Sequence, residues 1–421
     1  MSPYAASLGR FWMLCVVGSA LGCSHVQPTQ AASPVCVGYA RDFDVFWQTM
    51  RDEYVFFPEK KTDWSVVRER YRPTADTASS PKAWLGILEH SIDALYDAHL
   101  SARVNSRASP RLVPSGLDLW AEWRNGSAIV TSVREGFGAA RAGVTPGMEV
   151  VEIGGRSVHS ATRERIDPSI ITPDSSALVW ALLSALAGRR DQTRVLVVRI
   201  PGSHLDTLNL DALGPPSVDN PPALPLVEWR KLTDSVGYIR LNDLTDARTV
   251  TEFDTAIAGL RHTRALVLDL RNTPQGGNTD VAEPILGRFI ARTMKYQRVV
   301  PRRAAGYDRG VGARGPWQYT APLAVLVGRW TGSMGEGMAI GIDGMRRGTV
   351  VGSRMAGLAG AVEEIRLPCS HFVVGYPAAR LLHLDGTPRE SYRPRIEVVP
   401  RTRSGSGDDV LTAALELLRS H

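Results

Sequence analysis

Cysteine is scarce in this sequence, with four among 421 residues, and Cys15 and Cys23 lie close to the start. The remaining Cys36 and Cys369 exclude a small disulfide-rich scaffold. They could pair in an oxidising compartment or stay as buried thiols, because a sequence does not show whether they meet. Metal-ligand spacing is missing too, since the nine histidines are scattered and no H-E-x-x-H occurs. We therefore expect neither a metal nor another cofactor.

Long hydrophobic runs are absent after the N-terminus, so no later segment is expected to span a membrane. Residues 1–23 hold one charge, Arg10, before an apolar run over residues 11–21. This run is too short to cross a bilayer and has the proportions of a signal peptide. We therefore expect the mature chain to be exported.

The end of the apolar run, Ala20-Leu21-Gly22-Cys23, resembles a bacterial lipobox. Lipidation of Cys23 would anchor the chain to an envelope membrane, with residues 24–36 as a polar tether. A plain signal peptide, cut nearby to release the chain into the periplasm, is the other interpretation.

An excess of acidic residues is also absent: 49 Lys and Arg against 43 Asp and Glu give a net charge of +6. Basic residues gather over residues 292–314, with Tyr296 and Tyr307 among them, a composition that nucleic-acid sites share. In an exported chain without a binding module, a solvated loop is the better interpretation, and no nucleic-acid partner is expected. Residues 310–315 satisfy G-x-G-x-x-G, but no strand precedes them and Pro316 follows, so no dinucleotide site is expected.

Composition and length predict a globular protein of two or three domains, with 43% hydrophobic and 22% charged residues. Apolar side chains recur at three- and four-residue spacing over residues 37–110, which predicts an N-terminal helical domain interrupted at residues 73–80. The last of its helices ends near Asp97 and His99. A lone histidine there is more often a surface cap or a structural residue than a catalyst.

Residues 111–206 instead show short alternating runs separated by turns, a pattern typical of strands. Within them, residues 138–158 begin Gly-Ala-Ala-Arg-Ala-Gly-Val-Thr-Pro-Gly and resemble the second half of a PDZ domain. The resemblance implies a loop whose backbone N–H groups hold a peptide's C-terminal carboxylate, beside a sheet edge that accepts an added strand. That loop would be Gly116, Leu117, Asp118 and Leu119. A small β domain that only spaces the others is the plainer interpretation.

A proline-rich stretch without periodicity, residues 207–227, predicts a linker. Residues 228–421 then alternate strand and helix patterns, with strands expected at 237–241, 265–270 and 322–328 and helices at 250–260 and 281–290. This alternation predicts an α/β core whose site lies in the loops at the ends of its strands.

The most informative stretch of this core is the apolar run over residues 322–328, which stops before Thr331-Gly-Ser333 and resumes as small and apolar residues at helical spacing. A serine at such a turn exposes its hydroxyl, and the free N–H groups and dipole of the next helix favour a developing oxyanion. Ser333 is therefore a candidate nucleophile. Capping the helix is the commoner role for a serine at this place.

Several segments together are similar to the carboxyl-terminal processing and tricorn-core family of serine peptidases: residues 265–271 with Gly276-Gly277, Ser333-Met-Gly-Glu336, residues 348–352, and residues 385–390 before residues 394–399. The order of helical segment, PDZ-like domain and core is similar as well. The resemblance implies a core of the ClpP/crotonase type with Ser333 as nucleophile. It also implies an oxyanion hole formed by the N–H of Met334 and that of Gly276 or Gly277. The loop over residues 269–277 is one residue longer than is usual in the family.

The family divides over its catalytic base. One branch uses a lysine twenty-five residues after the serine, but that position is Leu358 here and no lysine follows Lys295. The branch similar to tricorn takes a histidine just after the N-terminal helices, a place that His99 matches. Serine needs such a base, itself oriented by a third group, and Glu390 stands at the family position of that group.

We therefore predict an exported serine endopeptidase that captures a polypeptide C-terminus or unfolded segment with its PDZ-like domain and cleaves it by acyl transfer, using Ser333, His99 and Glu390. Two alternatives stay open. One is an envelope peptide- or ligand-binding protein with an inactive site, and the other is a serine hydrolase of non-peptide substrates.

Overall fold

The computed structural model describes residues 36, 38–202, 204–398 and 407–419. The expected signal peptide, the lipidation site Cys23 and the tether residues 24–35 lie outside these residues. Cys36 and Cys369, whose state the sequence left open, are both disulfide-bonded. In the described part of the chain, no helix is long and apolar enough to cross a membrane.

Six strands of the C-terminal half form one sheet, in the order β17-β14-β13-β10-β9-β8. The β8–β9 pair is antiparallel, and the other neighbours run parallel. The strands are β8 (Val227–Lys231), β9 (Val236–Leu241), β10 (Ala265–Asp269), β13 (Leu323–Val327), β14 (Thr349–Gly352) and β17 (Ile396–Glu397).

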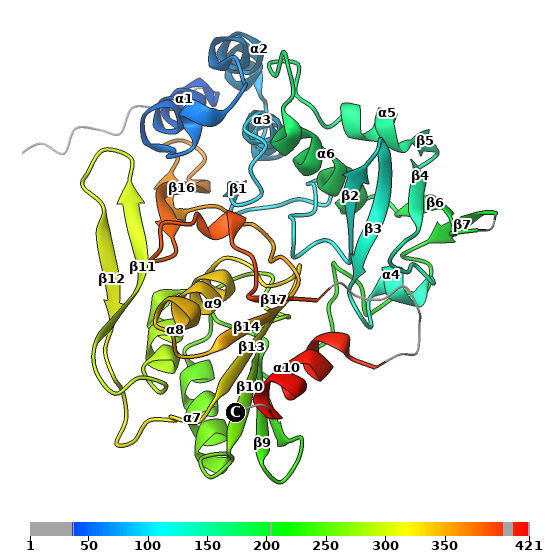
Figure 1. Ribbon diagram of the computed structural model, residues 1–421. Coiled ribbons are helices and arrows are strands. Elements are labelled where there is room, and N and C mark those ends of the chain that lie inside the picture. The colour runs from blue at the N-terminus through cyan, green and yellow to red at the C-terminus, as the bar shows by residue number, and fades with distance from the viewer. Residues whose placement is uncertain (1–35, 37, 203, 399–406, 420–421) are drawn as a thin grey trace, which may run out of the picture. The chain divides into compact units, whose positions relative to one another are not determined.

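Helices cover both faces of this sheet, which explains why β10 and β13 are apolar without alternation. Leu266 and Leu268 of β10 share a core with α7 (Arg248–Gly259), α8 (Thr279–Leu286) and α9 (Met334–Gly344). Ala265 and Val267 face the other way, toward α10 (Asp409–Arg419). Figure 1 shows α10 on the side of β13 away from α8 and α9. The expected α/β core is confirmed, and its parallel strands bring several loops to one edge.

The N-terminal helices α1 (Ala40–Glu53), α2 (Trp64–Thr77) and α3 (Pro81–Asp93) follow the predicted periodicity, with the short η1 (Phe57–Glu59) between α1 and α2. The break expected at residues 73–80 was wrong in its position, because α2 runs through Pro73 to Thr77. Pro73 removes one helical hydrogen bond, but Val67 and Ala75 on the same side of the helix are fully buried and hold it in place.

These helices do not form a separate domain. Their core includes Leu88 together with Val374 and Tyr376, which lie nearly three hundred residues later on a second, antiparallel sheet. The strands of that sheet are β1 (Ser101–Ala102), β11 (Met294–Pro301), β12 (Tyr307–Val311), β15 (Ala361–Arg366) and β16 (Val373–Leu382). Because of such shared cores, Val37–His421 forms a single compact unit.

A third sheet, in the order β2-β3-β4-β6-β7, occupies the region with the PDZ-like sequence. Its strands are β2 (Leu119–Arg124), β3 (Ser127–Val133), β4 (Glu149–Ile153), β6 (Val195–Arg199) and β7 (Leu205–Asn209), with the short β5 (Arg156–Ser157) beside β4. Its helices are α4 (Gly138–Arg141), α5 (Val158–Arg163) and α6 (Ser175–Ala187). The expected linker start at residue 207 was wrong, since it falls inside β7.

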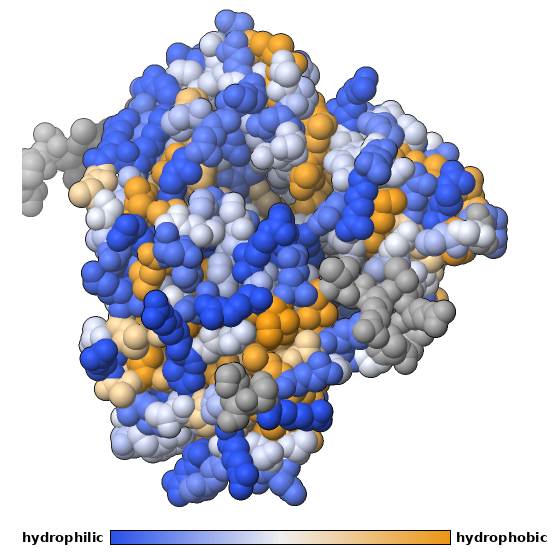
Figure 2. Space-filling view, in the orientation of Figure 1, coloured by the Kyte–Doolittle hydropathy of each residue, from blue (hydrophilic) through white to orange (hydrophobic). Residues whose placement is uncertain are grey.

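Strand β2 is an edge of the third sheet, and α6 packs beside it. Leu178 and Val179 of α6 are each 40% exposed. Hydrophobic side chains reach the surface in this region among mostly hydrophilic ones (Figure 2).

Candidate functional site

The turn between β13 and α9 presents Ser333 in a strained conformation, with φ +47° and ψ −108°. A non-glycine residue with such dihedrals costs about 1–3 kcal/mol and persists where the surroundings fix it. Here the carboxylate of Glu336 accepts the N–H of Ser333 at 2.8 Å. Glu336 is fully buried, and that burial raises its pKa to about 7. Ser333 and Glu336 form a capping box at the start of α9, and the Ser333 hydroxyl has a further partner.

That partner is His99, whose Nε2 lies 3.0 Å from Ser333 Oγ. The other ring nitrogen, Nδ1, lies 2.8 Å from the carbonyl oxygen of Ala359. A carbonyl can only accept, so Nδ1 carries the proton and Nε2 presents its lone pair to the serine hydroxyl. Burial and the nearby Arg389 guanidinium lower the pKa of His99 to about 4. The ring is therefore neutral at pH 7, as a general base must be.

The loop after α3 fixes the position of His99. Its backbone N–H donates to Asp97 Oδ1 at 2.8 Å, and Asp97 Oδ2 accepts the hydroxyl of Tyr54 at 2.5 Å. Tyr54 is fully buried in the core of the N-terminal helices. The first hundred residues thus bring His99 to a turn 234 residues further along the chain.

The structure does not place Glu390 as the group that orients His99. The imidazole Nδ1 has one proton to donate, and the carbonyl of Ala359 already accepts it. Glu390 lies in η2 (Arg389–Ser391), and its buried Oε2 has no hydrogen-bond partner among the described residues. Burial raises the pKa of this carboxyl. Ala359 was missed because a backbone carbonyl leaves no side-chain signature in a sequence.

The turn after β10 brings Gly276 against the serine. A Cβ on Gly276 would lie 2.4 Å from Ser333 Cβ and 2.9 Å from Ser333 Oγ, and its φ is +72°. The N–H of Gly276 donates to the Thr273 carbonyl at 3.0 Å, so this group is not a free donor, contrary to one of the two expectations. For Gly277 and Met334, no hydrogen bond from the N–H to another described residue occurs. These two N–H groups are the candidates for an oxyanion hole.

A cleft of about 1190 Å³ is lined by Ala98, Glu336 and Ala359, which adjoin His99 and Ser333, although these two residues are not themselves in its lining. Three parts of the chain line it: the N-terminal helices with Lys60 and Ala98, the third sheet and α6 with Trp120 and Leu183, and the core with Ala359. A cleft of this size accommodates an extended peptide of several residues.

The expected carboxylate-binding loop of residues 116–119 is not open to a ligand. The N–H groups of Gly116 and Leu117 donate to the carbonyls of Leu112 and Pro114, at 2.6 and 3.2 Å. Leu117 and Leu119 are fully buried. The carbonyl of Leu117 accepts Trp330 Nε1 at 2.7 Å.

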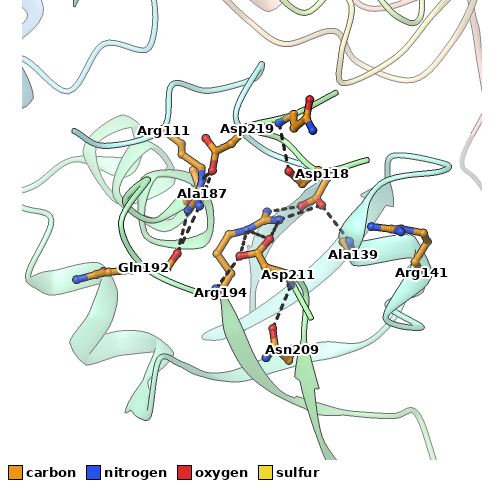
Figure 3. Close-up of polar contacts among 12 residues, drawn as sticks. Arg111, Asp118, Ala139, Arg141, Ala187, Gln192, Arg194, Asn209, Asp211 and Asp219 are labelled. Atoms are coloured by element: carbon orange, nitrogen blue, oxygen red, sulfur yellow. Dashed lines mark hydrogen bonds and ion pairs between the residues drawn. The ribbon is translucent and has the colours of Figure 1, made fainter. Parts of the chain in front are cut away.

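Asp118 of the same loop is fully buried and lies 2.5 Å from Arg194 Nη1, and Arg194 also pairs with Asp211 at 2.7 Å (Figure 3). Asp118 accepts the N–H of Ala139 as well. The loop was assigned wrongly because its glycine and apolar residues serve packing against the core, and its acidic residue neutralises a buried arginine.

Comparison with known proteins gives two matches to family models. The peptidase family S41 model matches residues 235–398, and the tricorn protease C1 domain model matches residues 38–89. A carboxyl-terminal-processing protease of Synechocystis sp. is 23% identical over 322 residues, which cover 74% of this chain and 69% of the relative. Residues 235–398 of this chain belong to peptidase family S41.

Solved structures agree with an S41 fold. The photosystem II D1 C-terminal processing protease has a TM-score of 0.55 at 18% identity, with 86% of this chain and 94% of that one covered. Mature CPAF complexed with lactacystin has a TM-score of 0.58 at 14% identity, with 91% and 97% covered. The predicted family is thus confirmed, and as an S41 member the chain is a serine-type peptidase.

Within this S41 chain, the family model spans Ser333 and Gly276, whereas His99 lies between the two matched segments. Leu358, at the position of a dyad lysine, is 5% exposed, and its Cδ1 is 3.3 Å from where a Cβ on Gly332 would be. The side chain next to the serine turn is therefore an aliphatic one that cannot accept a proton.

Proposed function

We propose that this chain is an exported serine endopeptidase that cleaves polypeptides by acyl transfer, with Ser333 as nucleophile and His99 as general base. The observation that carries the proposal is the 3.0 Å contact between His99 Nε2 and Ser333 Oγ, made by a neutral imidazole whose Nδ1 is committed to a carbonyl. The oxygen of serine attacks the scissile carbonyl while its proton passes to Nε2.

The oxyanion that forms in this step would accept the N–H groups of Met334 and Gly277. Both belong to turns at the ends of adjacent parallel strands, and Met334 begins α9, whose dipole favours negative charge at this end. His99 then returns the proton to the leaving amine, and a water repeats the sequence to release the acyl group. Glu390 has no direct contact with His99 in this scheme. Glu390 is one of the residues that line the cleft.

We propose further that the core is of the ClpP/crotonase type and that the third sheet is a PDZ-like domain. The free edge of β2 and the exposed apolar residues of α6 support binding of an extended segment by strand addition. Trp120 of β2 and Leu183 of α6 line the same cleft as Ala359, so a segment bound there leads toward the Ser333–His99 pair. The apolar run over residues 11–21 supports export.

The test is Ser333→Ala against the control Ser353→Ala, because Ser353 is a serine that lines the nearby cleft. Hydrolysis of an unfolded protein should fall by roughly 10⁴- to 10⁶-fold in Ser333→Ala and stay near wild type in the control. A fluorophosphonate should label the wild type at Ser333 and leave Ser333→Ala unlabelled. An unlabelled wild type without turnover would favour a binding protein, and turnover of esters but not of proteins would favour a non-peptide hydrolase.

A further inference from the structure

The carbonyl that orients His99 belongs to a short segment, residues 357–360, with a glycine at each end. Gly357 and Gly360 have φ of +78° and +74°, a conformation that other residues rarely adopt. The backbone therefore turns sharply on either side of Leu358 and Ala359. Left to itself, such a segment has ample freedom to rotate the carbonyl of Ala359 away from the imidazole.

Arg389 restricts the rotation of this segment by hydrogen bonds to two of its carbonyls. Its Nη2 donates to the carbonyl of Leu358 at 2.5 Å and to that of Gly360 at 2.9 Å. These two carbonyls flank the carbonyl of Ala359 along the chain, so fixing them fixes the peptide planes on both sides of it. Arg389 is only 2% exposed, which makes these charge-assisted bonds costly to exchange for water.

Glu336 holds the same segment from its other side. Its carboxylate accepts the N–H of Gly357 at 2.9 Å and that of Leu358 at 3.1 Å, in addition to the N–H of Ser333. One fully buried side chain therefore connects the nucleophile turn with the segment that orients the base. The positive charge of Arg389 acts on this carboxyl and helps to balance its burial.

We propose that Arg389 and Glu336 are positioning residues that hold residues 357–360 from two sides. They keep the carbonyl of Ala359 where it orients the imidazole of His99, which is the role of the aspartate carboxylate in a Ser-His-Asp triad. The inference rests on the proposed function, since it concerns the same base and nucleophile. Arg389 has a second effect, because a cation near the imidazole disfavours its protonated form. Substitution can separate the hydrogen bonds of Arg389 to residues 357–360 from the effect of its charge on His99.

Arg389→Gln removes both the charge and the Nη2 atom that donates to the two carbonyls. Arg389→Lys keeps the charge, but its side chain is one bond shorter and does not bring a nitrogen to the position of Nη2. The matched control is Arg347→Gln, because Arg347 likewise binds three backbone carbonyls, those of Phe289, Tyr319 and Ala321. For each variant, kcat and KM on an unfolded protein are measured against pH, together with the fluorophosphonate labelling rate and the thermal midpoint.

Arg389→Gln should lower kcat about 100-fold with KM within twofold, the loss expected when a catalytic group is misplaced. The acid limb of its kcat/KM profile should move to higher pH. Arg389→Lys should lower kcat about tenfold and leave that limb in place. Arg347→Gln should lose thermal stability and keep the kcat and the pH profile of the wild type.

A kcat of Arg389→Gln within twofold of the wild type, or a loss equal to that of Arg347→Gln, would overturn the inference alone. A wild type that neither labels nor hydrolyses would overturn the proposed function and this inference with it. If Arg389→Gln does not fold, the same measurements are made on Arg389→Lys. An unchanged kcat in Arg389→Lys would contradict the proposal that the hydrogen bonds of Arg389 position residues 357–360.

Discussion

Two turns at the ends of neighbouring parallel strands differ in what holds them. The turn after β13 has several hydrogen bonds among its own residues: Thr331 exchanges hydrogen bonds with Gly328 at 2.8 and 3.0 Å, and Glu336 binds the N–H of Ser333. The turn after β10 is longer and is fixed from elsewhere in the chain, since Asn272 accepts Arg134 of the third sheet at 2.7 Å. Bonds within its own turn contribute directly to the position of Ser333, whereas the loop that contains Gly276 and Gly277 also has a contact from the third sheet.

This difference has a consequence for the additional residue in the loop over residues 269–277. Arg271 binds Asp269 at its own strand end and Asp408 just before α10, each at 2.7 Å. A bridge between Thr273 and Thr331 then joins the two turns. The longer loop is accommodated because contacts outside it fix both of its halves, and Gly276 still reaches Ser333.

The contact between the turns is broken most severely by Gly276→Ala. The new methyl group would overlap Ser333 Cβ, and the residue would have to keep φ at +72°. We expect kcat to fall by roughly 10³-fold, as when an oxyanion donor is lost, measured as hydrolysis of an unfolded protein. Gly386→Ala is the control, because Gly386 has φ +96° with open space around it, so it adds backbone strain without the overlap. Equal activity in the two variants would contradict the packing of Gly276 on the serine.

The pH dependence of kcat/KM tests the environment of His99 beside the first turn. The pKa of His99 is lowered to about 4 by burial and by Arg389, against the raising effect of Asp97, and Arg103 adds to the lowering. A lowered pKa keeps the His99 ring neutral until the pH falls to about 4. Below that pH, kcat/KM should fall about tenfold per pH unit. No such fall is expected near pH 6.5, the ordinary pKa of histidine.

Glu336 is the other group that titrates near this pH range, with a pKa of about 7. The profile is therefore measured in the wild type and in Glu336→Gln. A limb near pH 7 that disappears in Glu336→Gln belongs to the carboxyl. A limb near pH 6.5 that persists in both chains would contradict the depressed pKa of His99.

The dependence of the second turn on the third sheet is tested by Asn272→Ala. This change removes the acceptor of Arg134 and the 2.9 Å bond that Asn272 donates to Asn242. Because Gly277, a proposed oxyanion donor, follows in the same loop, kcat should fall about tenfold. The exposed Asn220→Ala should behave as the wild type. Unchanged kcat in Asn272→Ala would mean that the loop keeps its shape by itself.

The first turn should respond less when its own link to the third sheet is cut. Trp330→Phe keeps most of the buried ring and removes the 2.7 Å bond to the Leu117 carbonyl. Urea denaturation should show a loss of about 1 kcal/mol in the free energy of unfolding, with kcat within twofold of the wild type. A kcat loss larger than that of Asn272→Ala would reverse the comparison between the turns.

The same contrast explains how much the sequence could predict. The strand, turn and helix around Ser333 were predicted because an apolar run, small residues and a helical pattern follow one another locally. The position of His99 was predicted through family resemblance, since nothing in the periodicity of residues 37–110 distinguishes it. Glu390 was assigned to a role that a backbone carbonyl takes, and no residue type marks that carbonyl.

Other failures have similar causes. Helix α6 was not predicted because most of its side chains are buried, which hides the 3.6-residue period of an amphipathic helix. An aspartate at its N-cap, Asp174, and a glycine at its C-cap, Gly188, were signals in the sequence. Arg389 stands in a quoted motif, but its two carbonyl partners are known only from the fold. Gly357 and Gly360, three residues apart, were the available hint that a special backbone conformation lies between them.

The core that the N-terminal helices share with the sheet containing β16 has a consequence for folding. Nucleophile and base come from opposite halves of the chain, and the helices that position His99 bury their apolar surface against strands that are synthesised last. Until the strands of that sheet are present, the N-terminal helices lack part of their core. The contact between His99 and Ser333 therefore depends on both halves of the chain folding together.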